Sequence, residues 1–299
     1  MLQQFNPKNK DLIVYINGKL VHRDEAGVSP FDSSVQNGDA CWEGLRVYKG
    51  KIFKLEEHLD RLEKSMTMLR YEGMPTREEI KDALRQTLAA NGMTDSVHVR
   101  LTVSRGLKYT SGLDPRINTK GCSLFILAEH KAPVYDTSGL HLITAKQRRP
   151  FADVLDQRIH SSNQLTSILA KLEANDAGAD DALMLDTAGN LAETNATHIF
   201  LVKNGTVLTS TTKACPTGIT RATVLSLCEQ EGIPCEVRDI TESEIHEADE
   251  VFCTGTMGEI VCVNQIDETI YHERQPGPVT QKLSALYQTL TETEGFPIL

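Results

Sequence analysis

Two stretches of the sequence carry residue types that could bind an anion. "PTGITRATVL" places Thr217, Gly218 and Thr220 directly before an expected helix, and free N–H groups at a helix start bind phosphate well. "CTGTMGE" interrupts an apolar strand with small residues, so that its backbone and threonine hydroxyls can approach a ligand closely. Taken alone, these stretches are better explained by N-capping at Thr220 and by a bulge or tight turn at residues 254–258.

Two charged residues could complete such a site. Glu193 lies in "LAETNATHIF", in a polar break between two apolar strands, where a buried carboxylate could hold a proton on a heterocycle nitrogen. Arg61 lies off the apolar stripe of an expected helix and could reach a phosphate. The alternatives are a solvated loop acid and a surface arginine paired with Glu57. The chain has no Walker loop, dinucleotide fingerprint or nucleophile–base motif.

The composition excludes several classes of protein. The 31 basic and 41 acidic residues give a formal net charge of −10, which is unfavourable for binding nucleic acid or anionic membranes. No apolar run has the length of a membrane span, and we expect no secretion signal. The seven cysteines are scattered without any CxxC pair, which argues against a metal site or a disulfide scaffold and favours the reducing cytoplasm.

The 299 residues are enough for two domains. Apolar alternation around Asn17-Gly18 predicts a hairpin, and another is expected at Asn204-Gly205. Apolar spacings of three and four predict a helix over residues 55–69, and Pro75 and Gly92 bracket a second helix over residues 76–90. Further helices are expected over residues 163–177, from near Ile219 and at the C-terminal "PVTQKL". We expect an N-terminal α/β domain (1–132), a linker (133–139) and a C-terminal domain (140–299), in a mixed α+β or α/β protein.

In their order and spacing these pieces resemble the fold-type IV family of pyridoxal-phosphate enzymes, the class IV aminotransferases. This family includes branched-chain and D-amino-acid aminotransferases and aminodeoxychorismate lyases. Five stretches carry the resemblance, and they are "NGDACWEGLRVYKGKIFKLEEHLDRLEKS", "ILAKLEANDAGADDALMLDTAGNLAETNATHIFLVKNG", "GITRATVLSLCEQEGIP", "ADEVFCTGTMGEI" and "GPVTQKL". The resemblance implies a two-domain fold with the cofactor cleft between the domains, and pyridoxal 5'-phosphate as the cofactor.

The resemblance also implies roles for single residues. Arg61 matches the family arginine at the cofactor phosphate, and Ile219 and Thr220 match the pair whose backbone N–H groups cap it. Thr256 matches a threonine that contacts the same phosphate. Glu193 matches the glutamate that pairs with the protonated pyridine nitrogen. A dianionic phosphate favours a guanidinium and a helix N-terminus, so the physical chemistry agrees.

The substrate side of the site is less strongly marked. His98, Arg100 and Arg105 lie where family members place groups near the substrate carboxylate, and either His98 or Arg100 could bind an acidic side chain. Met257, beside Thr256, is a further candidate substrate contact. By analogy with the family, we expect a homodimer that acts on a small amino acid and 2-oxo acid.

The chain departs from the family at the residue that should bind the cofactor covalently. A family segment such as "DPRIKSLNYLNNILAKIEA" carries a lysine where this chain, reading "DQRIHSSNQLTSILAKLEA", has His160. Shifting the alignment reaches only Ile159 or Arg158, and Gln164 stands where branched-chain enzymes commonly have tyrosine. Histidine has no primary amine, but it can move protons near neutral pH.

Three hypotheses follow from this departure. The protein could bind the cofactor non-covalently and use His160 as a base. It could instead bind a ligand without turnover, as an inactive relative, with His160 in a structural role. In the third hypothesis another lysine, of which Lys146 is the nearest, supplies the missing amine.

Overall fold

The chain folds into two compact units, which a computed structural model describes for residues 4–133, 135 and 138–298. Among the described residues, the N-terminal unit comprises residues 4–132, 159–163 and 291–298, and the C-terminal unit comprises residues 133, 135, 138–158 and 164–290. Residues 134, 136 and 137 of the predicted linker lie outside the described residues. The predicted domain limits of 132 and 140 stay a prediction, but residues 159–163 and 291–298 group with the N-terminal unit.

The N-terminal unit contains a seven-stranded sheet in the order β16-β4-β3-β5-β6-β1-β2. Its strands are β1 (Ile13–Ile16), β2 (Lys19–His22), β3 (Ala40–Tyr48), β4 (Lys51–Ile52), β5 (Val97–Ser104), β6 (Ser123–His130) and β16 (Phe296–Pro297). The hairpin predicted at Asn17-Gly18 joins β1 and β2, and both turn residues have the positive φ that this tight turn requires. Short helices lie in the connections, at η1 (Pro7–Asn9), α1 (Ser33–Asn37) and η2 (Pro115–Ile117).

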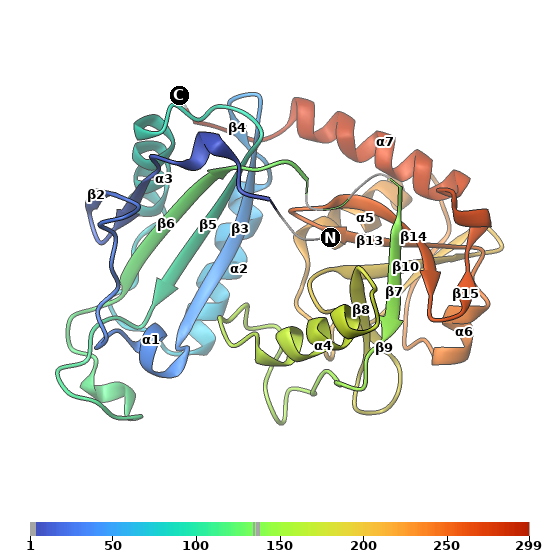
Figure 1. Ribbon diagram of the computed structural model, residues 1–299, viewed down its shortest axis with the longest axis horizontal. Helices are drawn as coiled ribbons and strands as arrows, with labels where there is room; N and C mark the ends of the chain where they lie inside the picture. The colour runs from blue at the N-terminus through green and yellow to red at the C-terminus, as the bar shows by residue number, and fades with distance from the viewer. Residues whose placement is uncertain (1–3, 134, 136–137, 299) are drawn as a thin grey trace. The chain divides into compact units, whose positions relative to one another are not determined.

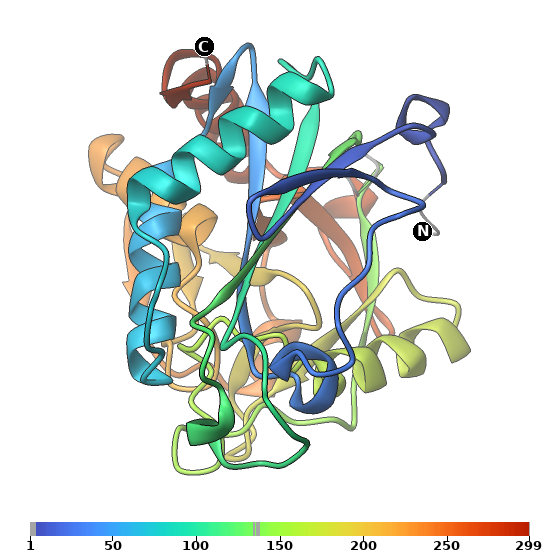
Figure 2. The same cartoon turned by 90° about the vertical axis from the view of Figure 1, so that its left-hand side faces the viewer.

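Two amphipathic helices, α2 (Leu55–Met68) and α3 (Arg77–Ala90), cover one face of this sheet. Figures 1 and 2 show both helices on the same side of the strands. Helix α2 was predicted from its apolar spacing and α3 from the flanking Pro75 and Gly92. Helix α3 begins with a capping box formed by Thr76 and Glu79. Side chains alternate along β3, so one face enters the core with the helices while the other carries Trp42, Gly44 and Arg46.

The C-terminal unit contains a nine-stranded sheet in the order β12-β11-β10-β13-β14-β7-β8-β9, with β15 paired to β14. Its strands are β7 (Leu140–Thr144), β8 (Asp181–Leu185), β9 (Leu191–Thr194), β10 (His198–Lys203), β11 (Thr206–Thr209), β12 (Cys235–Val237), β13 (Glu250–Gly255), β14 (Glu259–Ile266) and β15 (Thr269–Ile270). The hairpin predicted at Asn204-Gly205 joins β10 and β11. Mixed helices and strands in both units agree with the predicted α+β class.

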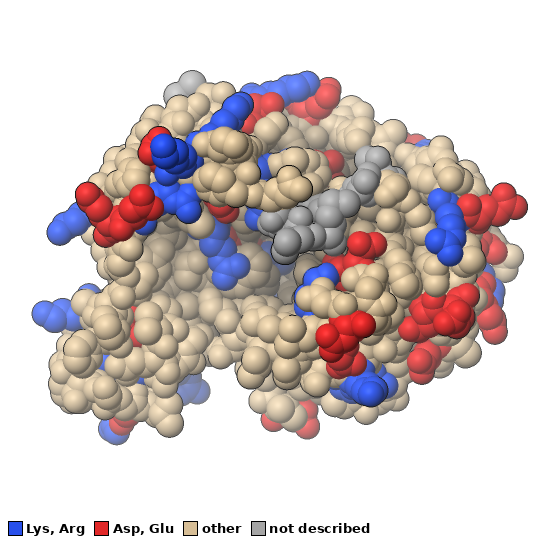
Figure 3. Space-filling model, in the orientation of Figure 1, with Lys and Arg blue, Asp and Glu red and all other residues tan. Residues whose placement is uncertain are grey.

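Helices accompany this second sheet. They are α4 (Leu165–Asp176), α5 (Ile219–Gln230), α6 (Glu242–His246), the short η3 (His272–Arg274) and α7 (Pro278–Thr293). Helix α4 packs through Ala170 and Ala174 against Ala182 and Met184 of β8, where small residues allow close approach. None of the described helices is long and apolar enough to cross a membrane. Figure 3 shows acidic and basic side chains interspersed on the face that it displays.

Helix α7 begins against the buried carboxylate of Glu250 in β13. The Oε1 atom of Glu250 accepts a hydrogen bond from the Val279 N–H (3.1 Å), and its Oε2 atom accepts bonds from the N–H and hydroxyl of Thr280 (2.9 and 2.7 Å). A Cβ atom on Gly277 would lie 2.0 Å from the carboxyl carbon of Glu250, so glycine is required there. Glu250 therefore caps this helix from a different element, and its charge complements the helix dipole.

We predict that Glu250→Gln lowers the free energy of unfolding by about 1–2 kcal/mol, because the amide keeps the size but loses the charge and one acceptor. Chemical denaturation of the purified protein measures this change. Glu247→Gln is the matched control, since Glu247 is exposed and pairs with Lys203 at the surface. Equal losses in the two variants would contradict the capping role.

Candidate active site

Residues 159–163 extend the sheet of the N-terminal unit along β3. The Trp42 N–H donates to the carbonyl of His160 (3.0 Å), and the Ser162 N–H donates to the carbonyl of Ala40 (2.8 Å). The indole N–H of Trp42 also donates to the carbonyl of Ser161 (3.1 Å). From the other side, the His160 N–H donates to the hydroxyl of Ser65 in α2 (3.0 Å). The backbone at His160 is thus held by a strand and by a helix.

The imidazole of His160 is oriented by three contacts. Its ring stacks on Trp42 with centroids 4.4 Å apart. The Nδ1 atom lies 2.5 Å from the carbonyl oxygen of Trp42 and 3.5 Å from Oε1 of Glu43. Because both neighbours are acceptors, Nδ1 carries the proton, and the neutral ring keeps its lone pair on Nε2. Burial lowers the pKa of His160 below its ordinary 6.5, with Arg61 adding to the effect and Glu43 opposing it, so the ring is neutral at pH 7.

Glu43 is the centre of this part of the site. Its side chain is fully buried and forms a bidentate ion pair with Arg61 of α2. The Nε atom of Arg61 donates to Oε1 of Glu43 (2.9 Å), and its Nη2 atom donates to Oε2 (2.6 Å). His58, one helical turn before Arg61, places Nδ1 2.7 Å from Oε2. Burial alone would raise the pKa of Glu43, but Arg61 and His160 outweigh it and hold the pKa well below the usual range. The alternative of a surface arginine paired with Glu57 was wrong.

The opposite face of the same sheet gathers positive groups. Cross-strand register places Arg100 opposite Gly44, and His98 opposite Arg46. The Arg100 guanidinium lies 3.5 Å above the Trp42 ring, and burial lowers the pKa of Arg100 to about 10. Burial, with Lys131, Arg46 and Arg100 beside it, lowers the pKa of His98 to about 3. Two buried nitrogens, Nε2 of His98 and Nε of Arg46, have no hydrogen-bond partner among the described residues.

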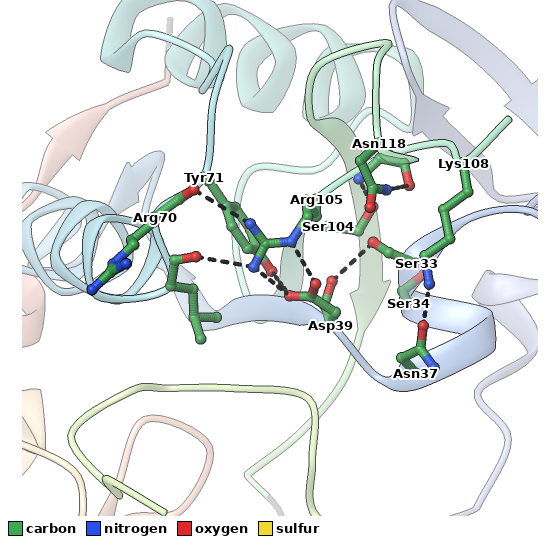
Figure 4. Close-up of polar contacts among 12 residues, drawn as sticks. Ser33, Ser34, Asn37, Asp39, Arg70, Tyr71, Ser104, Arg105, Lys108 and Asn118 are labelled. Carbon is green, nitrogen blue, oxygen red and sulfur yellow. Dashed lines mark hydrogen bonds and ion pairs between the residues drawn. The ribbon is translucent and has the colours of Figure 1, made fainter. Parts of the chain in front are cut away.

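The Arg105 side chain is hydrogen-bonded to the C-terminal end of helix α2 (Figure 4). Its guanidinium donates to the carbonyls of Leu69 (2.9 Å) and Arg70 (3.3 Å), and its Nε donates to the Asp39 carboxylate (2.6 Å). Tyr71 donates to the same carboxylate through its hydroxyl (2.9 Å). All the contacts drawn for Arg105 are to this helix end and to Asp39, so it braces the helix that carries Arg61.

In the C-terminal unit, helix α5 begins without a side-chain cap. Its N-cap residue is Gly218, so the first-turn amides of Ile219 and Thr220 have no capping side chain bound to them within the described part of the chain. A Cβ atom on Gly218 would lie 2.5 Å from the ring of His198, which leaves room only for glycine. His198 in turn bonds the carbonyl of Pro216 through Nε2 (2.8 Å) and fixes the loop before the helix.

The turn after β13 lies beside this helix start. Register pairs Thr254 with His198, the residue that contacts Gly218. The hydroxyl of Thr254 is buried and has no hydrogen-bond partner among the described residues. Thr256 and Met257 follow in the turn and are half-buried. An uncapped helix start beside an unsatisfied buried hydroxyl is an arrangement that an anion would complete.

Glu193 is buried in β9 and forms an ion pair. Its Oε1 atom lies 3.0 Å from Nε of Arg149, and both side chains are almost fully buried. The alternative of a solvated loop acid was therefore wrong. Glu193 belongs to the C-terminal unit and Arg61 to the N-terminal unit.

The sequence analysis missed Glu43, His58, Arg46 and Arg149. Glu43 and Arg46 had a usable signal, because a charge inside the apolar stretch "CWEGLRVY" must be paired if the stretch is a buried strand. Among the lysines, Lys146 is exposed, and Lys171 pairs with Asp181. Among the described residues, no cluster of histidine, cysteine or acidic side chains is arranged to hold a metal ion.

Comparison with known proteins assigns the family. Residues 40–266 match the model of the family described as amino-transferase class IV, and the chain belongs to this family. Its fold is that of the fold-type IV enzymes, which use pyridoxal 5'-phosphate.

Within the family, this chain is similar to branched-chain aminotransferases. It is 52% identical over 98% of its length to branched-chain-amino-acid aminotransferase-like protein 2 of Arabidopsis thaliana, but it spans only about half (52%) of that protein. It is 38% identical to a putative branched-chain-amino-acid aminotransferase of Methanocaldococcus jannaschii, covering 95% of this chain and 98% of that one. The branched-chain amino acid aminotransferase of Thermobaculum terrenum, solved in its PLP-bound form, superposes with a TM-score of 0.84 at 28% identity, covering 95% of each chain.

We predict that Glu43→Gln destabilises the protein by about 3 kcal/mol or more at pH 7, because it leaves a buried guanidinium without its carboxylate. Because the pKa of Glu43 is lower in the folded than in the unfolded state, ionised Glu43 adds to the free energy of unfolding at pH values above its unfolded-state pKa of about 4.3. This contribution is lost as the pH falls through the folded-state pKa. The difference in the free energy of unfolding between Glu43→Gln and wild type should therefore be largest near neutral pH and shrink below about pH 4. Urea denaturation at a series of pH values measures it.

The control for this prediction is Glu57→Gln. Glu57 is exposed on the same helix and pairs with Lys54 at 3.4 Å, so its loss should change stability by about 0.5 kcal/mol or less. A gap for Glu43→Gln that stays constant from pH 3 to pH 8 would show that the carboxylate charge is not the cause.

Proposed function

We propose that this chain binds pyridoxal 5'-phosphate without a covalent bond to lysine and transfers nitrogen between an amino acid and a 2-oxo acid, with His160 moving the proton. The observation that carries this proposal is the uncapped start of α5 beside the unsatisfied Thr254 hydroxyl. Family membership supports it, because the family uses this cofactor. The missing lysine is the reason to propose non-covalent binding.

The residues present fit the two ends of the cofactor. Ile219 and Thr220 would bind the phosphate through backbone N–H groups, and Thr256 through its hydroxyl, as the family resemblance implies. Arg61 would add a guanidinium, although its fork already engages Glu43. Glu193 would hold a proton on the ring nitrogen, because a buried carboxylate favours a cationic partner.

The bound cofactor supplies an electron sink that stabilises negative charge at the substrate Cα. The chain must then move one proton, and His160 has the required properties. Its ring is neutral and its Nδ1–H is committed to the Trp42 carbonyl, so Nε2 is the atom that accepts a proton. The contacts of its backbone to β3 and α2 keep the ring in this orientation.

A second reading, binding without turnover, is favoured by a specific observation. Besides the histidine in place of lysine, Gln164 replaces the tyrosine common in branched-chain enzymes, so two family residues have changed together. The third hypothesis has weaker support, because Lys146 is exposed and Lys171 is tied to Asp181.

The substrate proposal rests on the positive sheet face of the N-terminal unit. Arg100 and His98, with Arg46, would recognise a carboxylate on the substrate side chain. Arg100 also lines a cavity of about 320 Å³ whose other walls include Thr102, Phe125 and Leu127. Met257 would contact the substrate from the turn after β13. An acidic or an apolar amino acid, with its 2-oxo acid, would suit these groups.

The assembly proposal follows the family. We expect a cytoplasmic homodimer with its site near the subunit interface. Helix α4 exposes Leu165, Ile168 and Leu172 along one face, which a second copy of the chain would cover favourably.

We predict that the purified protein binds pyridoxal phosphate reversibly. Its absorbance should be that of the free aldehyde, and borohydride reduction followed by peptide mass mapping should find no lysine that carries the cofactor. Thr256→Val and Thr254→Val should each weaken binding about 10-fold or more, since each removes a hydrogen bond to a charged phosphate. Equilibrium dialysis measures the affinity.

The matched control is Thr289→Val on the exposed side of α7, which should leave the affinity unchanged. A labelled Lys146 or Lys171 would overturn the non-covalent proposal and support the third hypothesis. The absence of any binding by the wild type would overturn the cofactor assignment itself.

We predict that the wild type converts pyridoxamine phosphate and a 2-oxo acid to the aldehyde form faster than the cofactor does in free solution. His160→Gln should abolish this acceleration while leaving the affinity for pyridoxamine phosphate within about 3-fold, because glutamine bonds but cannot take the proton. Since the pKa of His160 is lowered, the rate should be flat above pH 6.5 and fall only at lower pH. Tight binding without acceleration would favour the inactive relative.

A further inference from the structure

Arg149 is a buried arginine that the family resemblance did not assign. It follows β7, and its N–H donates to the carbonyl of Leu185 in β8 (2.9 Å), which fixes its backbone beside that strand. Its side chain crosses to β9, where Nε lies 3.0 Å from Oε1 of Glu193. Arg149 thus reaches the acid that would hold the ring nitrogen.

The same guanidinium continues into a chain of hydrogen bonds. Its Nη2 donates to the hydroxyl of Ser167 in α4 (2.9 Å) and to the carbonyl of Thr194 (3.4 Å). The Ser167 hydroxyl donates to Oε1 of Gln164 (3.1 Å), the residue in the family tyrosine position. Glu193 and Gln164 are therefore connected through Arg149 and Ser167, all within the C-terminal unit.

The charged and titratable groups near Glu193 come from several elements. Arg149 provides the ion pair, and Cys215, in the loop before α5, is near enough that burial together with Glu193 raises its pKa to about 12. Arg221, in the first turn of α5, also acts on Cys215, and it donates to the carbonyl of Ser210 (2.8 Å). That thiol is neutral, whereas Arg149 is a cation in direct contact with Glu193.

We propose that Arg149 is a positioning residue that limits how firmly a bound pyridine ring keeps its proton. This inference rests on the proposed function. The cation shares the negative charge of Glu193, so the carboxylate attracts the ring proton less strongly than it would alone. Arg149 also keeps the acid ionised in the ligand-free protein, where burial would otherwise favour its protonated form.

The first test is a pH titration of the spectrum of bound pyridoxamine phosphate, which cannot be held by a lysine. Removing the nearby positive charge strengthens the hold of Glu193 on the ring proton. In Arg149→Gln and Arg149→Met, the pH at which the spectrum reports loss of this proton should rise by about one pH unit or more. Arg149→Lys keeps the charge and should return the midpoint to within about half a unit of wild type.

The matched control is Arg148→Gln, which removes the same charge from an exposed neighbour that donates to the carbonyl of Ala145. It should leave the midpoint unchanged. If wild type binds pyridoxamine phosphate and Arg149→Gln titrates at the wild-type pH, the inference is overturned while the proposed function stands. An equal shift in Arg148→Gln would also overturn it, because the effect would then be one of net charge.

The second test uses the ligand-free protein and separates the two proposals. In Arg149→Gln the buried Glu193 loses this cation, so its folded-state proton affinity rises. An acid whose pKa is raised in the folded state lowers the free energy of unfolding at every pH above its unfolded-state pKa of about 4.3, and this loss grows with pH. The deficit in unfolding free energy relative to wild type should therefore widen from about pH 5 to pH 8, whereas a mere packing defect gives a constant deficit.

The two tests together leave no ambiguous result. A widening deficit without any cofactor binding by wild type upholds the ion-pair role of Arg149 and refutes the proposed function. A constant deficit refutes the ion-pair role whether or not the cofactor binds.

Discussion

The candidate site of the N-terminal unit depends on the buried ion pair between Glu43 and Arg61. A fully buried carboxylate is tolerated only when cations and hydrogen bonds satisfy it, and here the Arg61 fork and His58 do so. This pair joins β3 to α2. Because Glu43 also lies 3.5 Å from Nδ1 of His160, the pair helps to hold the segment that carries His160. A phosphate at Arg61 would share the guanidinium with Glu43. Arg61 therefore acts as an oriented donor more than as a net positive charge.

The C-terminal unit repeats this arrangement with the roles exchanged. Glu193 and Arg149 form the second buried pair, and in this case the acid is the member proposed to meet the ligand. Each unit thus buries a neutralised pair, and neither has to bury an uncompensated charge.

Much of the fold could be predicted from the sequence because its signals are local. The Asn17-Gly18 turn, the apolar stripe of α2 and the capping box of α3 depend only on neighbours along the chain. The partners of Arg61 and Glu193 could not be predicted in this way, because Glu43 is 18 residues from Arg61 and Arg149 is on another element. Periodicity showed that Arg61 lies off the apolar stripe, but it cannot show that a neighbouring strand buries that flank. The helix after His160 begins at Leu165 and not at Asn163, because the Asn163 side chain is bonded to the carbonyl of Gly38.

If His160 stands in the position of the family lysine, as we propose, the site lacks an amine but keeps a group that can exchange one proton. With Nδ1 committed to the Trp42 carbonyl, the remaining chemistry of His160 is that of a single lone pair. If the chain bound no anion, position 254 would be more stable without its buried hydroxyl. Gly218 gives the start of α5 no capping side chain, and the Thr254 hydroxyl has no hydrogen-bond partner among the described residues. The free-energy cost of burying this hydroxyl without a partner is physically reasonable if a phosphate supplies the acceptor. The start of α5 and Thr254 are therefore a stronger guide to what this protein binds than the lysine position is.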